Sequence, residues 1–376
     1  MPLPYAAVTR IAATRASSVP AIALMLTATL VLAACGSAGS STTGGAPGSR
    51  TAAAAAPKRM TKVTLILDFV PNAVHAGIYR ALAAGYYRRE GIDLQVIQPT
   101  STQETLKLID AGRAQFGLAD GSDVAGLIDD RGDAQAVMAL VQRPLGGLIG
   151  LAGEHLRSPA ALRGKSVGIT GVPSDTAVLD TEVRHAGGDP AKVHVVTIGF
   201  NGAQALQAGR IAAFTGFIPD DGVQLQVSGR PITAFALDRN GGPSYPGLVA
   251  FTTRRLIAAD PALVRDFVAA TVQGYEDTLR DPARSLEDLL RLNPSLSRKL
   301  TGASLDVYLP LFTGRSAVGS SIAGSGGDGG GGGVPFGTLQ SANIAAMSAW
   351  MLQNHLIHAP ISAERYGTNR FLPTRR

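Results

Sequence analysis

LDFVPNAVHAGIYRALAAGYY, residues 67–87, is the stretch that decides the fold of this 376-residue chain. It continues an apolar run (63–69) that ends in an aromatic residue, breaks at Pro71 and Asn72, and passes through His75 into a helix-like spacing of apolar residues. A strand, a polar turn and a helix start, in this order, open a βαβ unit. Open α/β folds bind ligands at such turns, outside the carboxyl ends of their strands. We therefore expect this turn to contribute to a binding site.

The side chains of the turn favour a flat ligand with polar edges over a bare anion. Phe69 offers an aromatic face, Asn72 an amide and His75 an imidazole, and Tyr79 follows one helical turn later. All four are candidate ligand contacts. The alternative role of Phe69 and Tyr79 is packing in the core. The alternative for Asn72 is a turn residue or helix cap, and for His75 a bond to backbone at the helix start.

Strand-like and helix-like runs alternate along most of the chain. Further strands are expected at 116–119, 136–141, 148–151, 166–169, 193–198, 212–218 and 232–237, and helices at 102–111, 122–129, 174–185 and 203–207. This alternation predicts an α/β protein with mixed, mostly parallel sheets flanked by helices. From Pro261 onward the apolar residues are three and four positions apart, which predicts a mainly helical final part.

The N-terminal part does not belong to the predicted fold. Residues 1–67 contain no Asp or Glu, and Arg10 and Arg15 precede a short apolar run that ends in small residues before Cys35. These features are typical of a secretory signal peptide, here 1–34. The run is shorter than the roughly 20 apolar residues of a membrane-spanning helix. Its end resembles a bacterial lipobox, which implies lipidation of Cys35 and membrane attachment through a flexible tether, 35–59.

Charge and cysteine content exclude several classes of site. Removing Arg10 and Arg15 with the signal leaves 32 basic against 28 acidic residues, a net charge of +4, which is too weak for a nucleic-acid footprint. Cys35 is the only cysteine, so an intrachain disulfide and a Cys-based metal site are excluded. His355 and His358 are expected on one helix face, without a third ligand for zinc. We expect no metal and no cofactor.

The opening unit also carries a family resemblance. LDFVPNAVHAGIYRALAAGYYRREGIDLQVIQP (67–99) resembles the opening of the thiamine-pyrimidine-precursor binding proteins, a type II periplasmic-binding branch related to hydroxymethylpyrimidine synthase. Further matching blocks are KLIDAGRAQFGLADGSDV (107–124), ALRGKSVGI (161–169), GFIPDDGVQL (216–225) and PSYPGLVAF (243–251). The resemblance implies two lobes joined by a hinge, with the ligand between them. One lobe is expected to hold 60–146 and 247–376, including a Gly-rich loop at 324–333, and the other 147–246.

Two more turns between a strand and a helix offer polar groups to a ligand. Asp120 and Ser122 follow the strand expected at 116–119, and Thr170 and Ser174 follow the strand expected at 166–169. Backbone N–H groups at a helix start, together with these side chains, form a polar rim. All four residues are candidate ligand contacts, and Asp120 has helix capping as its alternative role.

Asp221 is the main charged candidate. In the family an acidic residue before this Gly-Val meets the amine and protonated ring nitrogen of an aminopyrimidine, and the resemblance implies the same role here. The preceding residues, Ile218-Pro219-Asp220, depart from the family's aromatic-aromatic-Asn run, and Phe69 stands where the family usually has Trp. The alternative for Asp221 is a solvated helix start. Tyr245 is expected either to close over the ligand or to pack at the hinge.

The resemblance implies a monomeric, lipid-anchored extracytoplasmic receptor that delivers a small heterocycle, foremost a thiamine pyrimidine precursor, to an ABC permease. Alternatives of the same fold bind a riboflavin-like flavin, an organosulfonate or nitrate, and another class is a ligand-sensing module. A synthase is disfavoured because that enzyme needs cysteines near 248–253, where this chain has none. His75 stands where the synthase's sacrificial histidine would be, and is interpreted here as a polar contact of a binding protein.

Overall fold

The computed structural model describes residues 59–154, 156–314 and 333–374. The predicted signal peptide (1–34) and Cys35 lie outside the described residues, as do nearly all of the tether (35–59) and of the Gly-rich loop (324–333). None of the described helices is both long and apolar enough to span a bilayer.

The first of two five-stranded sheets contains the opening unit. Its order is β2-β1-β3-β10-β4, with β1 (Thr61–Ile66), β2 (Ile92–Ile97), β3 (Phe116–Ala119), β4 (Gln135–Val141) and β10 (Leu248–Thr252). β1 pairs in parallel with β2 and β3, whereas β10 runs antiparallel to both β3 and β4. Four strands therefore point the same way, and the late strand β10 is inserted against them.

The second sheet repeats this plan. Its order is β7-β6-β8-β5-β9, with β5 (Gly146–Leu151), β6 (Ser166–Ile169), β7 (His194–Thr197), β8 (Ala213–Phe217) and β9 (Ile232–Ala236). β6 pairs in parallel with β7 and β8, whereas β5 runs antiparallel to β8 and β9. The predicted α/β class with mixed, mostly parallel sheets is confirmed.

The chain passes between the sheets twice, after β4 and after β9. Arg143 in the first connection donates from Nε to Oδ2 of Asp238 in the second at 2.7 Å, which ties the two connections together. The predicted lobe boundaries at 146/147 and 246/247 fall beside these connections and stay predictions.

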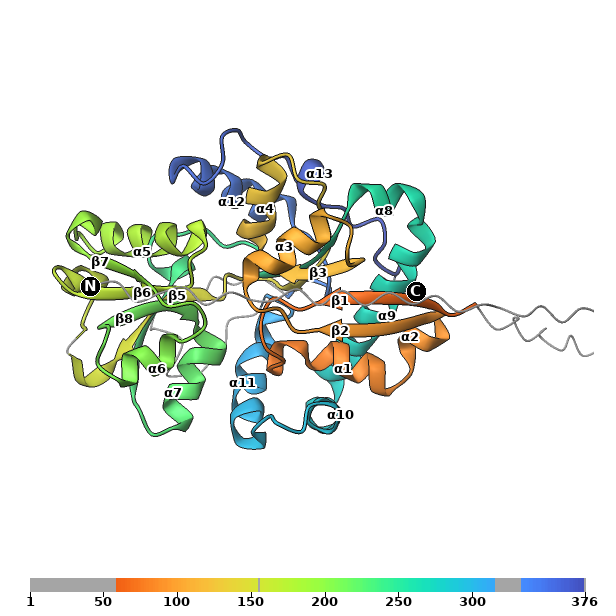
Figure 1. The fold of residues 1–376 in the computed structure, drawn as a ribbon, viewed down its shortest axis with the longest axis horizontal. Coiled ribbons are helices and arrows are strands. Elements are labelled where there is room, and N and C mark those ends of the chain that lie inside the picture. Colours follow the sequence, from red (N-terminus) through yellow and green to blue (C-terminus); the bar gives the residue numbers. More distant parts are fainter. Residues whose placement is uncertain (1–58, 155, 315–332, 375–376) are drawn as a thin grey trace, which may run out of the picture. The chain divides into compact units, whose positions relative to one another are not determined.

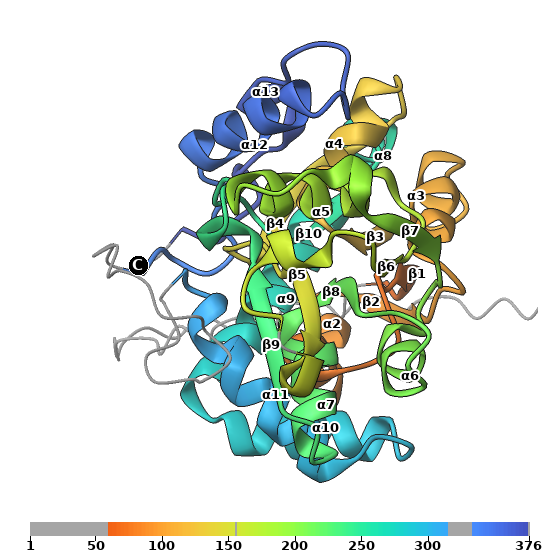
Figure 2. The same cartoon turned by 90° about the vertical axis from the view of Figure 1, so that its left-hand side faces the viewer.

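Helices cover both faces of each sheet (Figures 1 and 2). They are α1 (Ala76–Ala83), α2 (Tyr86–Arg89), α3 (Thr102–Asp110), α4 (Gly121–Asp129), α5 (Pro173–His185), α6 (Gly202–Gln207), α7 (Val223–Val227), α8 (Arg254–Ala259), α9 (Pro261–Arg280), α10 (Pro282–Leu292), α11 (Arg298–Leu311), α12 (Ser341–Gln353) and α13 (Ala363–Tyr366). Figure 1 shows α3 and α4 on one side of β1–β3 and α1 and α2 on the other, and α5 opposite α6 and α7 around the second sheet.

The first strand ends earlier than the sequence indicates. An apolar run over 63–69 predicts a strand to Phe69, but β1 ends at Ile66. Asn72 caps the short helical turn Ala73–His75 by accepting from the backbone N–H of Val74 at 2.8 Å, so the chain must leave the sheet before it. Phe69 is consequently a turn residue, half-buried beyond the strand end.

Helix α9 shows how local sequence produces the helical final part. Asp260 caps its start by accepting from the N–H of Leu263 at 2.9 Å, and Pro261 occupies the first position, where no N–H is needed. Its apolar face packs on the first sheet, where Phe267 stacks on Phe116 of β3 with ring centroids 3.8 Å apart.

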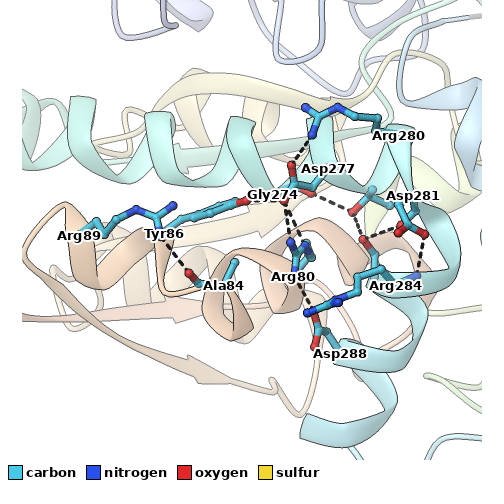
Figure 3. A network of polar contacts seen from close by, with 12 residues as sticks. Arg80, Ala84, Tyr86, Arg89, Gly274, Asp277, Arg280, Asp281, Arg284 and Asp288 are labelled. Atoms are coloured by element: carbon cyan, nitrogen blue, oxygen red, sulfur yellow. Dashed lines mark hydrogen bonds and ion pairs between the residues drawn. The ribbon is translucent and has the colours of Figure 1, made fainter.

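A network of charged groups fastens α1 and α2 to α9 and α10 (Figure 3). Arg80 donates to Asp277 at 3.1 Å and to Asp288 at 2.9 Å, with 17% of its side chain exposed. Tyr86 donates its hydroxyl to Asp277, and the guanidinium of Arg89 lies 4.3 Å from the ring centroid of Tyr86. One arginine thus bridges two carboxylates from separate helices.

The expectation that His355 and His358 share a helix face is wrong. Helix α12 ends at Gln353, and His355 has a φ of 56°, a left-handed conformation that a continuing helix excludes. His358 instead bonds to Asp129 through Nδ1 at 2.7 Å.

Candidate ligand-binding site

The carboxyl ends of parallel strands from both sheets face one cavity. It encloses about 90 Å³ that the centre of a water molecule can reach, enough for more than one water. Its walls come from residues after β1, β3, β6 and β7, from the start of β5, from β8 and the turn after it, and from Tyr245 in the second connection between the sheets. The position expected from the opening βαβ unit is therefore the position of the cavity.

The cavity brings together seven of the ten candidate residues. These are Phe69, Asp120, Ser122, Thr170, Ser174, Asp221 and Tyr245. The other three, Asn72, His75 and Tyr79, are not part of its lining. Tyr79 is 6% exposed and its hydroxyl is bonded to Asn293, which matches its alternative role in the core.

His75 lies behind the cavity wall and holds Asp68, which lines it. His75 is fully buried, and its Nε2 lies 2.9 Å from Oδ1 of Asp68. Its Nδ1 accepts from the backbone N–H of Asn72 at 3.2 Å. Because Nδ1 is an acceptor, the ring proton resides on Nε2 and His75 is the donor to Asp68. Both predicted alternatives for Asn72 and His75, a cap and a helix-start contact, are present in this turn.

Aromatic rings approach the cavity from both sheets. Phe69, after β1, meets Phe200, after β7, edge to face with ring centroids 4.4 Å apart. Tyr245 is 2% exposed and stacks on Trp350 at 6.1 Å, with its hydroxyl bonded to Ser122. Tyr245, in the second connection, therefore both lines the cavity and packs on α12.

The turn after β3 places two carboxylates at the cavity. Asp120 accepts from the N–H of Ser122 at 2.8 Å and from its hydroxyl at 2.7 Å, so it caps α4 and faces the cavity at once. Asp123 accepts from the hydroxyl of Ser174 on α5 at 2.6 Å. Desolvation raises the pKa of Asp123 to about 7, although the bond from Ser174 opposes this shift. Desolvation and the charge of Asp123 raise the pKa of Asp120 well above its ordinary value.

The turn after β6 has a similar arrangement. Thr170 donates to Oδ2 of Asp175 from its backbone N–H at 2.7 Å and from its hydroxyl at 2.5 Å. Desolvation raises the pKa of Asp175 despite these bonds. Thr170 thus orients a carboxylate that the sequence analysis did not name.

Asp220 and Asp221 lie in a π-helical turn, Ile218–Gly222, directly after β8. Asp221 accepts from the backbone N–H of Phe217 at 3.0 Å, and desolvation raises its pKa to about 6. Asp220 accepts from the hydroxyl of Tyr308, and desolvation raises its pKa well above the ordinary value. The alternative of a solvated helix start does not describe Asp221, because it lines the cavity and precedes α7 by a π turn.

The cavity is strongly acidic. Its lining includes Asp68, Asp120, Asp123, Asp175, Asp220 and Asp221, and among the described residues it includes no Lys, Arg or His. Carboxylates accept hydrogen bonds and attract positive charge. Such a lining suits a ligand with several N–H groups and disfavours an anion.

Four of these aspartates and Phe200 were not predicted from the sequence. Asp68 precedes Phe69 at the predicted strand end, and Asp123 and Asp175 lie in turns that were already singled out. Asp220 is adjacent to Asp221. Proximity to the carboxyl end of a strand was therefore a usable signal for these four. The same signal applies to Phe200, which lies between the strand expected at 193–198 and the helix expected at 203–207.

Comparison with known proteins places this geometry in a family. The model of the family described as NMT1/THI5 like matches residues 72–285. The formylaminopyrimidine-binding protein of Halalkalibacterium halodurans is 27% identical over 307 residues, 80% of this chain and 88% of that protein. The riboflavin-binding protein RibY of Chloroflexus aurantiacus is 27% identical over 360 residues, 92% of this chain and 95% of that protein.

More distant similarities extend to an enzyme and to a solved structure. The 4-amino-5-hydroxymethyl-2-methylpyrimidine phosphate synthase THI5 of Saccharomyces cerevisiae is 25% identical over 251 residues, 64% of this chain and 74% of that protein. The alkanesulfonate-binding protein SsuA of Xanthomonas axonopodis pv. citri superposes with a TM-score of 0.62 at 15% identity, covering 82% of this chain and 99% of that chain. The chain therefore belongs to the NMT1/THI5-like family and has the α/β fold of the periplasmic binding proteins.

Proposed function

We propose that this protein is the extracytoplasmic solute-binding component of an ABC importer, and that its ligand is an aminopyrimidine of the thiamine-precursor type. The observation that carries the proposal is the cavity itself, which combines aromatic rings with six carboxylates at the carboxyl ends of strands from both sheets. An aminopyrimidine offers a flat ring and exocyclic N–H donors to such a lining. The similarity to a formylaminopyrimidine-binding protein supports the same ligand class.

Two alternative ligands are less compatible with the cavity. A sulfonate or nitrate ion would meet carboxylates and, within the described residues, no cationic side chain. The sulfonate-binding SsuA shares the fold only, at 15% identity, and carries no argument for its ligand here. Riboflavin remains the second candidate, because the match to RibY covers 92% of this chain.

The cysteine content and the position of His75 favour a binding protein over a synthase. The segment 248–253 contains no cysteine, and the only cysteine of the chain is Cys35. His75, at the position of the synthase's reacting histidine, is fully buried behind Asp68 and outside the lining. The resemblance implies that the synthase builds its pyrimidine from its own histidine and pyridoxal phosphate. Incubation with pyridoxal phosphate should therefore leave the mass of this protein unchanged, and loss of mass at His75 would instead identify a synthase.

A thermal-shift panel with the full chain tests the ligand class. 4-Amino-5-hydroxymethyl-2-methylpyrimidine at a hundredfold excess over Kd should stabilise the protein by about 2.7 kcal/mol, which is several degrees in Tm. Riboflavin and taurine serve as the other arms. A rise in Tm with riboflavin alone would make riboflavin the proposed ligand in place of the aminopyrimidine. A rise with taurine alone would contradict the conclusion that the acidic cavity disfavours anions.

The proposed anchor needs its own measurement, since Cys35 lies outside the described residues. Lipidation at Cys35 should place the protein in the membrane fraction, and Cys35→Ala should release it or block processing after Ala34. A wild-type protein that is wholly soluble and cleaved elsewhere would contradict the anchor without affecting the ligand.

A further inference from the structure

We infer that the ligand carries a positively charged nitrogen and that Asp68 is the carboxylate that pairs with it. This inference rests on the proposed function and extends it, because a ring with amino groups can bind either as a neutral molecule or as a cation. The inference concerns the charge of the ligand, and Asp68 is the residue that recognises this charge.

Asp68 has one oxygen engaged and one oxygen open. Its Oδ1 accepts from Nε2 of His75 at 2.9 Å, whereas Oδ2 is buried and has no hydrogen-bond partner among the described residues. The residue is 4% exposed and lines the cavity. A buried carboxylate oxygen without a partner is costly, so the fold leaves at Oδ2 an acceptor that only a molecule in the cavity can satisfy.

His75 orients Asp68 without neutralising it. Because Nδ1 of His75 accepts from the backbone N–H of Asn72, the imidazole has a single proton, on Nε2, and carries no charge. Lysine and arginine side chains are also missing from the described part of the lining. The compensating positive charge for Asp68 must therefore arrive with the ligand.

The residues around Asp68 also favour the binding of a cation. Asp220 lies close enough for its charge and that of Asp68 to repel each other, and its partner Tyr308 donates to Asp220 rather than to Asp68. Phe69, the next residue, and Phe200 contact each other edge to face and also line the cavity. A ring face attracts a cation that lies over it. A charged nitrogen here would contact a carboxylate and an aromatic ring together.

An organic cation fits this arrangement better than a metal ion. Within the described residues, the group of three acidic or histidine side chains whose ligand atoms lie within 4.8 Å of one another is Asp129, Asp130 and His358, none of which lines the cavity. The six aspartates of the cavity do not converge on one point in this way. They are spread along walls from both sheets, as binding of an extended molecule with several N–H groups requires.

Matched probes that differ only in charge test the inference on the full-length protein. At about pH 7.5, where the free pyrimidine ring is largely unprotonated, 4-amino-5-aminomethyl-2-methylpyrimidine carries an ammonium group, and 4-amino-5-hydroxymethyl-2-methylpyrimidine is its neutral counterpart of nearly equal size. By calorimetric titration the cationic member should bind at least tenfold more tightly to the wild type. Asp68→Asn retains an oxygen for His75 and removes the charge, so it should abolish this preference. Asp93→Asn, an exposed position on β2, should retain it.

A second pair, benzamidine and benzamide, separates the charge of the ligand from its pyrimidine ring. Equal or tighter binding of the neutral pyrimidine to the wild type would overturn the inference and leave the proposed function standing. A tenfold preference that survives in Asp68→Asn would overturn the role of Asp68. If neither pyrimidine binds and benzamidine binds better than benzamide, the inference of a cationic ligand holds and the proposal of an aminopyrimidine is overturned. If none of the four compounds binds, the inference and the proposed ligand are both overturned. The wild-type comparison stands even if Asp68→Asn does not fold.

Discussion

The hydroxyl of Ser174 donates to Oδ1 of Asp123 at 2.6 Å, and this bond joins α5, which packs on the second sheet, to α4, which packs on the first. Two other bonds link the same parts of the fold. Trp350 donates from Nε1 to the hydroxyl of Thr181 at 2.9 Å, and Gln103 donates to the carbonyl of Gly171 at 3.2 Å. These three contacts close the cavity between the layers of the two sheets, and two lining residues, Ser174 and Asp123, make one of them.

Ser174→Ala should weaken this closure. The substitution removes the donor and leaves Asp123 without its partner, which costs about 1–3 kcal/mol for a desolvated acceptor. We expect Tm to fall by several degrees at pH 8 and the affinity for the ligand to fall with it. Thermal melting and small-angle scattering with and without ligand measure both effects. Ser228→Ala, at an exposed serine that bonds within its own helix, should change neither.

The unliganded protein should lose stability as pH rises from about 4 to about 7. The folded-state pKa values of Asp123 and Asp221 are raised to about 7 and about 6. In this window the folded state holds protons that the unfolded chain has released, so the free energy of unfolding decreases with pH. Carboxylates with lowered pKa, such as Asp277, act in the opposite direction but only at lower pH.

Urea denaturation between pH 5 and pH 8 measures this slope. Asp123→Asn should flatten it, because the amide does not titrate, and should raise stability at pH 8 by removing a desolvated charge. Asp93→Asn, at an exposed position, should leave the slope unchanged. A stability that is flat or rises across this range in the wild type would mean that the cavity carboxylates are well solvated.

The parts of the fold that follow from short-range patterns were predictable. The strands expected at 116–119 and 166–169 coincide with β3 and β6, because each is a short apolar run with a polar turn after it. The antiparallel insertion of β5 and β10 has no local signature, since it depends on where the chain returns from the other sheet. Strand direction was therefore outside the reach of the sequence pattern.

In the site, too, some residues were predictable from the sequence and others depended on the three-dimensional fold. Ser174 was identifiable because it follows an expected strand, and Asp221 because its block, 216–225, resembles the family. The role of His75 was not, because it depends on which ring nitrogen meets Asn72 and which meets Asp68, a matter of three-dimensional geometry within one turn. The pairing of Asp220 with Tyr308 joins residues 88 positions apart and likewise required the fold.

Gly77→Ala should destabilise the protein, whereas Gly126→Ala should not. Both glycines are in helices, but a methyl group on Gly77 would lie 2.3 Å from the ring of Tyr275. That ring is fixed by stacking on Phe336 and by its hydroxyl bond to the carbonyl of Val74. We expect a loss of about 1–3 kcal/mol from overpacking. Nothing lies within 4 Å of a methyl on Gly126, so alanine should gain about 0.5–1 kcal/mol there. Urea denaturation of both variants gives the two signs, and equal effects would contradict the close packing of α1 on α9.

Arg80→Ala should cost more than an ordinary surface ion pair. Its partners Asp277 and Asp288 have side chains 11% and 10% exposed, so both carboxylates lose a largely buried donor. We expect the free energy of unfolding to fall by about 1–3 kcal/mol. Added salt should change this loss little, because largely buried ion pairs are weakly screened. Arg184→Ala breaks an exposed pair with Asp180 on α5 and should cost about 0.3–0.5 kcal/mol. Equal losses at the two positions, measured by urea denaturation, would mean that the network of Figure 3 is solvated.

Asp221→Asn should weaken binding of the aminopyrimidine while leaving the fold intact. The carboxylate faces the cavity and accepts one bond from the N–H of Phe217, a bond that the oxygen of an asparagine can also accept. Loss of a charge-assisted hydrogen bond of about 1.5–3 kcal/mol corresponds to roughly 10- to 150-fold weaker binding. Without ligand the variant should melt at or slightly above the wild-type temperature, because the pKa of Asp221 is raised and its ionised form is unfavourable there. His75→Ala provides the contrast, since it should impair the unliganded fold by leaving Asp68 without its buried donor. Calorimetric titration together with melting of the two variants separates the roles. If Asp221→Asn binds like the wild type, Asp221 only closes the turn after β8, and the aminopyrimidine proposal loses its main chemical support.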